Sequence, residues 1–390
     1  MKNIVVASDS LKGSLTSEEV AEAAAEGIRA VFPECNVTRI CIADGGEGTT
    51  EALVRALGGE SVQVDVHDPL MRPMKATYGI TGHGRTLPDG SCAGRTAIME
   101  MSAASGLPLL APEERDPMKT TTFGTGEMIM DAYRRGCTRF LLGIGGSATN
   151  DAGTGMLSAL GARFLDKDGN ILEGTGENLA RMTAVDMSGV PEGIIKAWFD
   201  VACDVDNPFC GPEGAAYIFA PQKGAGPDTV RLLDKGMESF AEMTRKVCGQ
   251  DIRTMKGAGA AGGLGGALAA YLGARLVPGS EMILDAVGFD SLAAGADLVI
   301  TGEGRIDRQT SMGKVPSAVL KRASALGIPV IAIAGCIGED METSQGFAAV
   351  FPVTPYGMDK DEAMRPSTAS ANVRRTVHQI MNVIRISGNE

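Results

Sequence analysis

The sequence is poor in aromatic residues, in histidine and in long apolar runs. Only 4% of its 390 residues are Phe, Trp or Tyr, so aliphatic side chains and Met must build most of the interior. The three His residues are not spaced with one another or with a Cys as zinc ligands would be, which argues against a zinc site. No apolar run approaches the ~18 residues of a membrane span, and the apolar start MKNIVVAS is too short for a signal sequence.

Paired cysteines and an excess of positive charge are also missing. The eight Cys residues form no CxxC pair, so we expect reduced thiols and a cytoplasmic protein. Lys and Arg number 36 against 48 Asp and Glu, a net charge of −12, which repels a phosphate backbone. The sequence therefore argues against nucleic acid or a membrane as a partner and favours a small molecule, with a homo-oligomer left open.

What the sequence does contain is a repeated strand–turn–helix rhythm at both ends. Short β-branched runs lead into Gly or Asp turns and then helical patterns at residues 3–31 and 37–58, and the rhythm returns after about residue 288. The middle differs, because the runs 74–81 and 95–101 resemble an antiparallel pair. We therefore expect an α/β fold: a doubly wound, mostly parallel, Rossmann-like (flavodoxin-like) domain from 1–65 and 289–390, with a second α/β domain, 66–288, inserted.

Polar residues cluster where the expected strands end. The four motifs are SDSLKGS from Ser8, ADGGEGT from Ala43, GIGGSATNDAG from Gly143 and TGEGRIDRQT from Thr301. Ligands collect at the carboxyl ends of strands in open α/β sheets, and glycines let backbone N–H groups face an anion. Taken singly, each motif also fits an ordinary loop, a tight turn or a surface ion-pair cluster, but their shared position favours a ligand site.

Two standard nucleotide-binding motifs can be compared with the sequence. No Walker A motif is present, and GAGAAG at 257–262 matches the dinucleotide pattern without a strand before it, so it is better explained as the start of a tightly packed helix. GIGGSA at 143–148 does follow a strand, but no strand-end acidic residue lies about 20 residues later. A nicotinamide-dependent dehydrogenase of a small hydroxy acid stays the alternative function, and a ligand-binding protein without enzyme activity is a weaker one.

Taken together and in order, these motifs resemble the type I glycerate kinases. The resemblance rests on SDSLKGSL, ADGGEGT, GIGGSATNDAG, ACDVDNP with GPEGAA and PQKGA, and TGEGRID, and covers nearly the whole chain; Leu11 and Ala152 stand where Phe and Gly are common. It implies an ATP-dependent kinase that phosphorylates D-glycerate at its 2-hydroxyl group, with the active site in the cleft between two α/β domains. Strand-end carboxylates, glycine loops and a few cations also suit phosphoryl transfer from MgATP.

Chemistry, rather than the resemblance, suggests a role for each candidate residue. We expect the backbone N–H groups from Gly145 to Ser147 to bind a phosphate in place of a Walker loop, with Asn150, Asp151 and Ser10 also at the cofactor. Lys12 and Arg305 would neutralise the transferred phosphoryl group and the glycerate carboxylate, in either order. Asp44, Glu47 and Glu303 would hold Mg²⁺ directly or through water, and Asp204 or Asp307 would accept the proton of the attacking hydroxyl.

Overall fold

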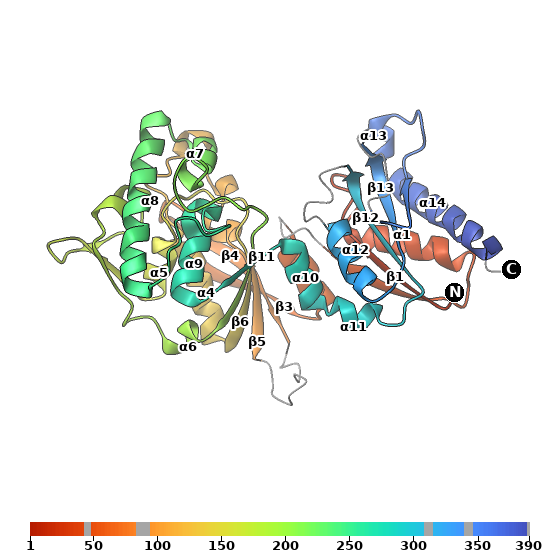
Figure 1. Ribbon diagram of the computed structural model, residues 1–390, viewed down its shortest axis with the longest axis horizontal. Helices are drawn as coiled ribbons and strands as arrows, with labels where there is room; N and C mark the ends of the chain where they lie inside the picture. The colour runs from red at the N-terminus through yellow and green to blue at the C-terminus, as the bar shows by residue number, and fades with distance from the viewer. Residues whose placement is uncertain (43–47, 83–93, 308–314, 339–345, 388–390) are drawn as a thin grey trace. The chain divides into compact units, whose positions relative to one another are not determined.

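The computed structural model divides the chain into two compact units (Figure 1). Unit 1 consists of Met1–Asp44 and Ile283–Glu390, and unit 2 is Gly45–Met282. The structure describes residues 1–42, 48–82, 94–307, 315–338 and 346–387. Within these ranges, no helix is both long and apolar enough to cross a membrane.

Unit 1 is built on a five-stranded sheet in which every pair is parallel, in the order β14-β13-β12-β1-β2. Counted along the unit, this is the 2-1-3-4-5 order of flavodoxin-like folds. Its elements are β1 (Asn3–Ser8), α1 (Ser17–Arg29), β2 (Asn36–Cys41), α11 (Phe289–Ala293), β12 (Leu298–Ile306), α12 (Val315–Ala325), β13 (Val330–Ile337), β14 (Ala349–Pro352), α13 (Lys360–Ala363) and α14 (Pro366–Ser387).

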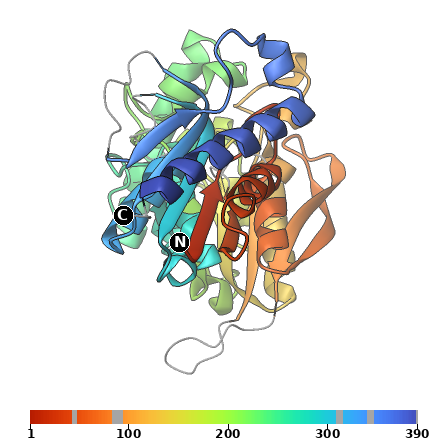
Figure 2. The same cartoon turned by 90° about the vertical axis from the view of Figure 1, so that its right-hand side faces the viewer.

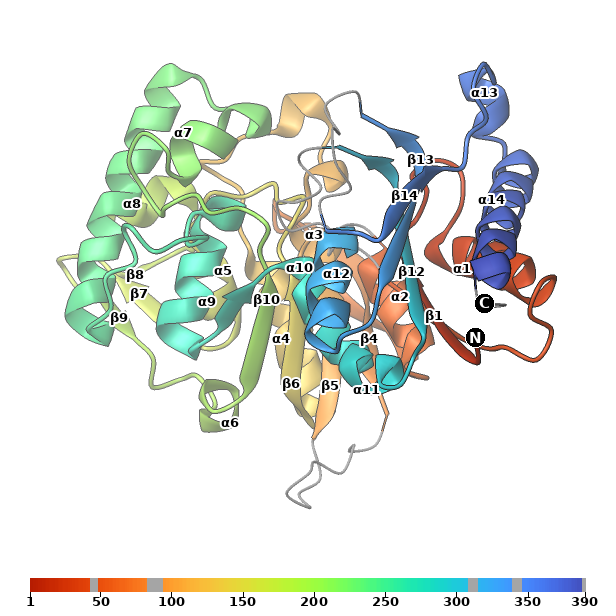
Figure 3. The ribbon, with the colours of Figure 1, turned by 45° about the vertical axis from the view of Figure 1, so that its right-hand side comes forward.

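Helices cover both faces of this sheet. The helices α1 and α14 pack side by side on one face, and α12 lies on the other (Figures 2 and 3). Helix α1 begins with a capping box between Thr16 and Glu19, and its apolar residues Val20, Ala24 and Ile28 are fully buried, at the spacing of one helix face. The apolar strands β1, β12 and β13 are consequently buried on both sides, as parallel sheets require.

Unit 2 contains a six-stranded sheet in the order β11-β10-β6-β5-β4-β3. The four strands from β5 to β11 are mutually parallel, whereas β4 is antiparallel to both β3 and β5. The strands are β3 (Glu60–His67), β4 (Pro73–Thr81), β5 (Arg95–Glu100), β6 (Cys137–Gly143), β10 (Trp198–Ala202) and β11 (Arg275–Val277), and a small antiparallel sheet adds β7 (Arg163–Leu165), β8 (Ile171–Leu172) and β9 (Ala184–Asp186). The predicted antiparallel pairing of 74–81 with 95–101 is confirmed.

Most helices of unit 2 share one hydrophobic core with this sheet. The helices are α2 (Thr49–Ala56), α3 (Ser102–Ser105), α4 (Phe123–Arg134), α5 (Thr154–Ala159), α6 (Glu192–Ile195), α7 (Ala215–Phe219), α8 (Pro227–Cys248) and α9 (Leu264–Leu272), with α10 (Gly279–Val287) at the boundary to unit 1 and 3-10 turns η1 (Leu107–Leu109), η2 (Pro112–Glu114), η3 (Gly176–Arg181), η4 (Pro221–Lys223) and η5 (Ala260–Gly263). As predicted, α8 starts at Pro227 and ends at Gly249, which has a φ of 71°.

The α/β class and the doubly wound sheet are confirmed, but one predicted boundary is wrong. The segment up to residue 65 does not all belong with the N-terminal strands, because β3 pairs along its whole length with β4 of unit 2. Helix α2 packs on β4 and β5 in the same unit. The change of unit therefore comes near residue 44, about 20 residues earlier than the sequence suggests.

Candidate functional site

The strand order of unit 1 fixes where a ligand would bind. In a 2-1-3-4-5 sheet the connections diverge between the first and third strands, which leaves a crevice at their carboxyl ends. Here those strands are β1 and β12, which pair in parallel with Ile4 opposite Leu298. The loop after β1, residues 9–15, and the carboxyl-terminal end of β12 with the next residue, 303–307, carry five of the predicted site residues.

The loop after β1 crosses the end of β12 closely. The backbone N–H of Asp9 donates to the carbonyl of Gly302 at 2.9 Å, and the Asp9 carboxylate accepts from the backbone N–H of Ser10 at 2.6 Å. A methyl group on Gly304 would lie 3.5 Å from the backbone nitrogen of Lys12. Asp9 is buried, whereas the side chain of Lys12 is exposed.

The end of β12 supplies carboxylates and a second cation. Glu303 is buried with 7% of its surface exposed, and Arg305 donates through Nε to Asp307 at 3.1 Å. The Arg305 side chain is 63% exposed and that of Asp307 17%. The structure thus brings Ser10, Lys12, Glu303, Arg305 and Asp307 to one edge of unit 1. Two further predicted metal ligands, Asp44 and Glu47, lie outside the described residues.

The glycine turn after β6 carries the predicted phosphate site of unit 2. Gly145 and Gly146 are exposed, and Ser147 is 8% exposed. Gly146 has a φ of 71°, which a non-glycine residue adopts only at a cost. In the described part of the chain, the backbone N–H groups of Gly145, Gly146 and Ser147 donate no hydrogen bond. Three successive N–H groups without a protein acceptor form the kind of concavity that binds anions.

Two residues of the same motif that were predicted at the cofactor, Asn150 and Asp151, are buried and contact other parts of the protein. The carboxylate of Asp151 is fully buried and accepts hydrogen bonds from the Thr122 N–H and hydroxyl groups, both at 2.7 Å, and from the N–H groups of Gly153 and Gly155, both at 3.1 Å. It therefore ties the turn to the start of α4. Asn150 is also fully buried, and its amide nitrogen contacts the sulfur of Met237 at 3.2 Å.

A fully buried lysine, missed by the sequence analysis, lies beneath this turn. Lys223 is 1% exposed, and its Nζ donates to the Ser147 hydroxyl oxygen at 2.8 Å and to the Thr149 carbonyl at 2.7 Å. Burial lowers the pKa of Lys223 to about 7, against the opposing effect of Asp151. Burial raises the pKa of Asp151, and its four donors oppose that shift. The PQKGA motif showed that a lysine was present, but nothing in its pattern indicated burial.

The predicted base Asp204 lies at the carboxyl edge of unit 2. It is exposed, and its Oδ1 accepts from the backbone N–H of Gly279, the first residue of α10, at 2.9 Å. Its neighbour Asp206 forms an ion pair with Lys256 at 3.2 Å. Among the described residues, no group of three His, Cys, Asp or Glu side chains is arranged to hold a metal ion.

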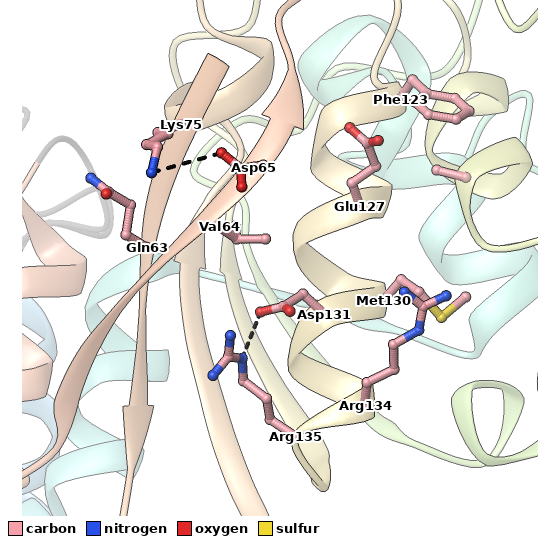
Figure 4. A pocket seen from close by; sticks show the side chains of 11 residues that line it. Gln63, Val64, Asp65, Lys75, Phe123, Glu127, Met130, Asp131, Arg134 and Arg135 are labelled. Carbon is pink, nitrogen blue, oxygen red and sulfur yellow. Dashed lines mark hydrogen bonds and ion pairs between the residues drawn. The ribbon is translucent and has the colours of Figure 1, made fainter. Parts of the chain in front are cut away.

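A hollow of about 500 Å³ lies elsewhere on unit 2, between α4 and the strands β3 and β4 (Figure 4). Its charges already face one another: Asp131 pairs with Arg135 at 2.7 Å and Asp65 with Lys75 at 3.9 Å. Glu127 accepts from the backbone N–H of His67 at 2.7 Å. These pairs leave no excess of either charge, and no sequence motif of interest reaches this hollow.

Comparison with known proteins gives a consistent family. The sequence model of the glycerate kinase family matches residues 4–385. A glycerate kinase of Bacillus subtilis (strain 168) is 43% identical over 386 residues, 98% of either chain. A glycerate 2-kinase of Escherichia coli (strain K12) is 42% identical over 381 residues, 96% of this chain and 97% of its own. A crystal structure from Salmonella typhimurium LT2, described as a glycerate kinase 2, has a TM-score of 0.88 at 42% identity, with 100% of both chains covered.

Proposed function

The chain belongs to the glycerate kinase family, and from this membership we propose that it transfers the γ-phosphoryl group of ATP to the 2-hydroxyl group of D-glycerate. The bond from the γ-phosphorus to its bridging oxygen breaks, a bond to the hydroxyl oxygen forms, and the hydroxyl proton is released. The products are ADP and 2-phosphoglycerate. The name of the Escherichia coli relative, a 2-kinase, supports this choice of hydroxyl group.

The observation that carries the proposal is the turn from Gly145 to Ser147. Its three N–H groups donate to no acceptor in the described chain, and the ammonium group of Lys223 lies directly below. Phosphoryl transfer depends on positioning the phosphates and stabilising their charge, because the transition state is largely dissociative. We propose that this turn binds a phosphate of the nucleotide.

The edge of unit 1, together with Asp204 of unit 2, supplies the remaining chemistry in this proposal. The exposed side chains of Lys12 and Arg305 neutralise the transferred phosphoryl group and the glycerate carboxylate. Asp307, already beside Arg305, or Asp204 accepts the hydroxyl proton as the new bond forms. Ser10 adds a hydroxyl group and a backbone N–H at the same edge. The predicted placement of the site between two domains stays a prediction.

Magnesium fits the donor type at this edge. The carboxylate of Glu303 is an oxygen ligand of the sort that Mg²⁺ prefers, and we propose that it holds the ion with Asp44 and Glu47, directly or through water. A bound Mg²⁺ would supply charge neutralisation at the phosphates.

One coupled assay tests the function. Purified protein with D-glycerate and MgATP should release ADP in step with 2-phosphoglycerate, identified by phosphorus NMR against both phosphoglycerate isomers. Formation of 3-phosphoglycerate would overturn the regiochemistry, and ADP release that does not depend on glycerate would overturn the activity. The dehydrogenase alternative gains no support, since the family model and the named relatives reported above are glycerate kinases.

A further inference from the structure

Lys223 donates a hydrogen bond to the hydroxyl oxygen of Ser147, which affects the direction of that hydroxyl hydrogen. We propose that Lys223 is a positioning residue, whose donation to Ser147 turns the Ser147 hydroxyl hydrogen away from the protein and toward a bound phosphate oxygen. This rests on the proposed function, because the oxyanion is taken to be a phosphate of the nucleotide or of the phosphorylated product.

The first support is the geometry of the donors. An ammonium group has three donors and no acceptor, so in the contact of 2.8 Å the Ser147 oxygen must accept. In the described chain the Ser147 hydroxyl has no acceptor of its own. Because Ser147 keeps 8% of its surface exposed, its hydrogen is left to point toward solvent or a ligand. The backbone N–H groups of Gly145 and Gly146, in the same turn, also have no acceptor in the described chain.

The second support is how firmly Lys223 is held. Its Nζ also donates to the carbonyl of Thr149 at 2.7 Å, so two bonds fix it at either end of the Ser147–Thr149 segment. The next residue, Gly224, has a φ of 98°, and a methyl group there would lie 2.1 Å from the carbonyl oxygen of Arg115. This close approach keeps the chain tightly packed beside Lys223. Burying a lysine is costly unless it is bonded, and both bonds are directed at the anion-binding turn.

The electrostatic surroundings make this contact sensitive to pH. Burial lowers the pKa of Lys223 to about 7, and the buried Asp151 is the charged group that acts on it. The neighbouring segment contributes Arg115, whose backbone carbonyl lies beside Gly224. A neutral amine gains a lone pair, so above this pKa the Ser147 hydroxyl can donate to Lys223 instead of to the ligand. Phosphate binding should consequently weaken as the pH rises through about 7.

A double-mutant cycle tests the proposal on the full-length protein. Lys223→Met, Ser147→Ala and the double variant are compared by calorimetric binding of ADP and, separately, of 2-phosphoglycerate, and by kcat and KM. We expect each single variant to weaken binding of one of these two ligands by about tenfold, the scale of a hydrogen bond to a charged group. The double variant should be no weaker than Ser147→Ala. The ligand that responds identifies which phosphate Ser147 meets.

Independent, multiplicative effects in the cycle would overturn the proposal, because a lysine that only holds the fold acts whether or not Ser147 is present. If Lys223→Met fails to fold, the pH profile decides instead. Affinity in the parent should fall between pH 6 and 9 relative to Ser147→Ala, in which ligand ionisation is identical. Equal profiles would refute the proposal. Absence of glycerate turnover in the parent would refute the proposed function alone, since the binding cycle does not require turnover.

Discussion

At the scale of single residues, two lysines of the candidate site differ in how deeply they are buried. Lys12 is exposed in the loop after β1, whereas Lys223 is 1% exposed beneath the turn after β6. An exposed lysine keeps the flexibility of its four-carbon stem, whereas a buried lysine is held in place and its pKa shifts readily. Their substitution should therefore affect rate and stability in opposite proportions.

Lys12→Met should lower kcat by about two orders of magnitude, or roughly 2.7 kcal/mol, while the melting temperature stays nearly unchanged. The reason is that, in the proposed mechanism, Lys12 meets charge that develops during transfer, while its exposed side chain contributes little to packing. The matched control is Lys2→Met, since Lys2 is also exposed but precedes β1 at the opposite end of the strand. Near-normal kcat and KM in Lys12→Met would place Lys12 outside the site.

The pH dependence of the free energy of unfolding should show the effect of the lowered pKa of Lys223. Its pKa in the folded state is about 7, below the ordinary value of 10.5, so between these values the unfolded chain binds a proton that the folded chain does not. Stability therefore rises with pH in this window. Against Lys223→Met, the free energy of unfolding of the parent should increase by up to about 1.4 kcal/mol per pH unit between pH 7 and 10, measured by urea denaturation. A parallel pH dependence in the two proteins would contradict this.

Some features of the candidate site could be predicted from the local sequence, and others could not. Strand-end motifs correctly placed Ser10, Lys12, Glu303, Arg305 and Asp307 at one edge, because the carboxyl ends of parallel strands must meet there. Asp151 was expected at a ligand, yet it bonds to Thr122, a residue 29 positions away. Such long-range bonding leaves no local pattern. The burial of Lys223 was equally hidden, since lysine is almost never fully buried.

At the scale of elements, the glycine-rich segment 257–262 packs against the residues that directly follow the turn from Gly145 to Ser147. Gly262 has a φ of 67°, and a methyl group on it would lie 2.1 Å from the Thr149 carbonyl oxygen, which accepts from Lys223. The Ala152 N–H donates to the Gly262 carbonyl at 3.0 Å. The sequence predicted a tightly packed helix start here, and the structure gives η5 and α9. What it packs against could not be foreseen, because the partner lies over 100 residues earlier.

Gly262→Ala should destabilise the protein by more than the strain of a positive φ alone. Gly273 provides the control, because it has a similar φ of 63° but open space around the added methyl group. We expect Gly273→Ala to destabilise by about 1 kcal/mol and Gly262→Ala by about 3 kcal/mol or more, with weaker ADP binding, because the clash displaces Thr149. Denaturant melts and calorimetry measure both. Equal losses in the two variants would show that the backbone relaxes away from the contact.

At the scale of the whole molecule, the sheet orders show which parts of the fold were predictable. The α/β class followed from the strand–turn–helix rhythm, which is local. The position of β3 was missed, because the sequence analysis grouped residues up to 65 with the N-terminal strands, whereas β3 forms a hairpin with β4, the next strand along the chain. The excess of acidic over basic residues is likewise a property of the whole chain, and it bears on the metal requirement.

Activity should be lost in excess chelator and restored by added Mg²⁺. The cluster at the edge of unit 1 includes the carboxylates of Glu303 and Asp307 beside two cations, and carboxylates repel a phosphate unless a divalent ion neutralises the charge. The coupled assay with and without EDTA measures this, with the coupling enzymes checked separately under the same conditions. Full turnover in excess EDTA would rule out the metal ligands proposed here.

The pairing of β1 with β12 has a consequence for synthesis on the ribosome. Val5 lies near one end of the chain and its partner Val299 near the other. At about 5–20 residues per second, β1 emerges some 15–60 s before the strand it must join. Unit 2, encoded between them, can acquire its own core during that interval. The apolar face of α1, which α14 finally covers, stays without its partner until residues 366–387 have been synthesised. Nascent chains stalled before this point should therefore be held by chaperones through α1.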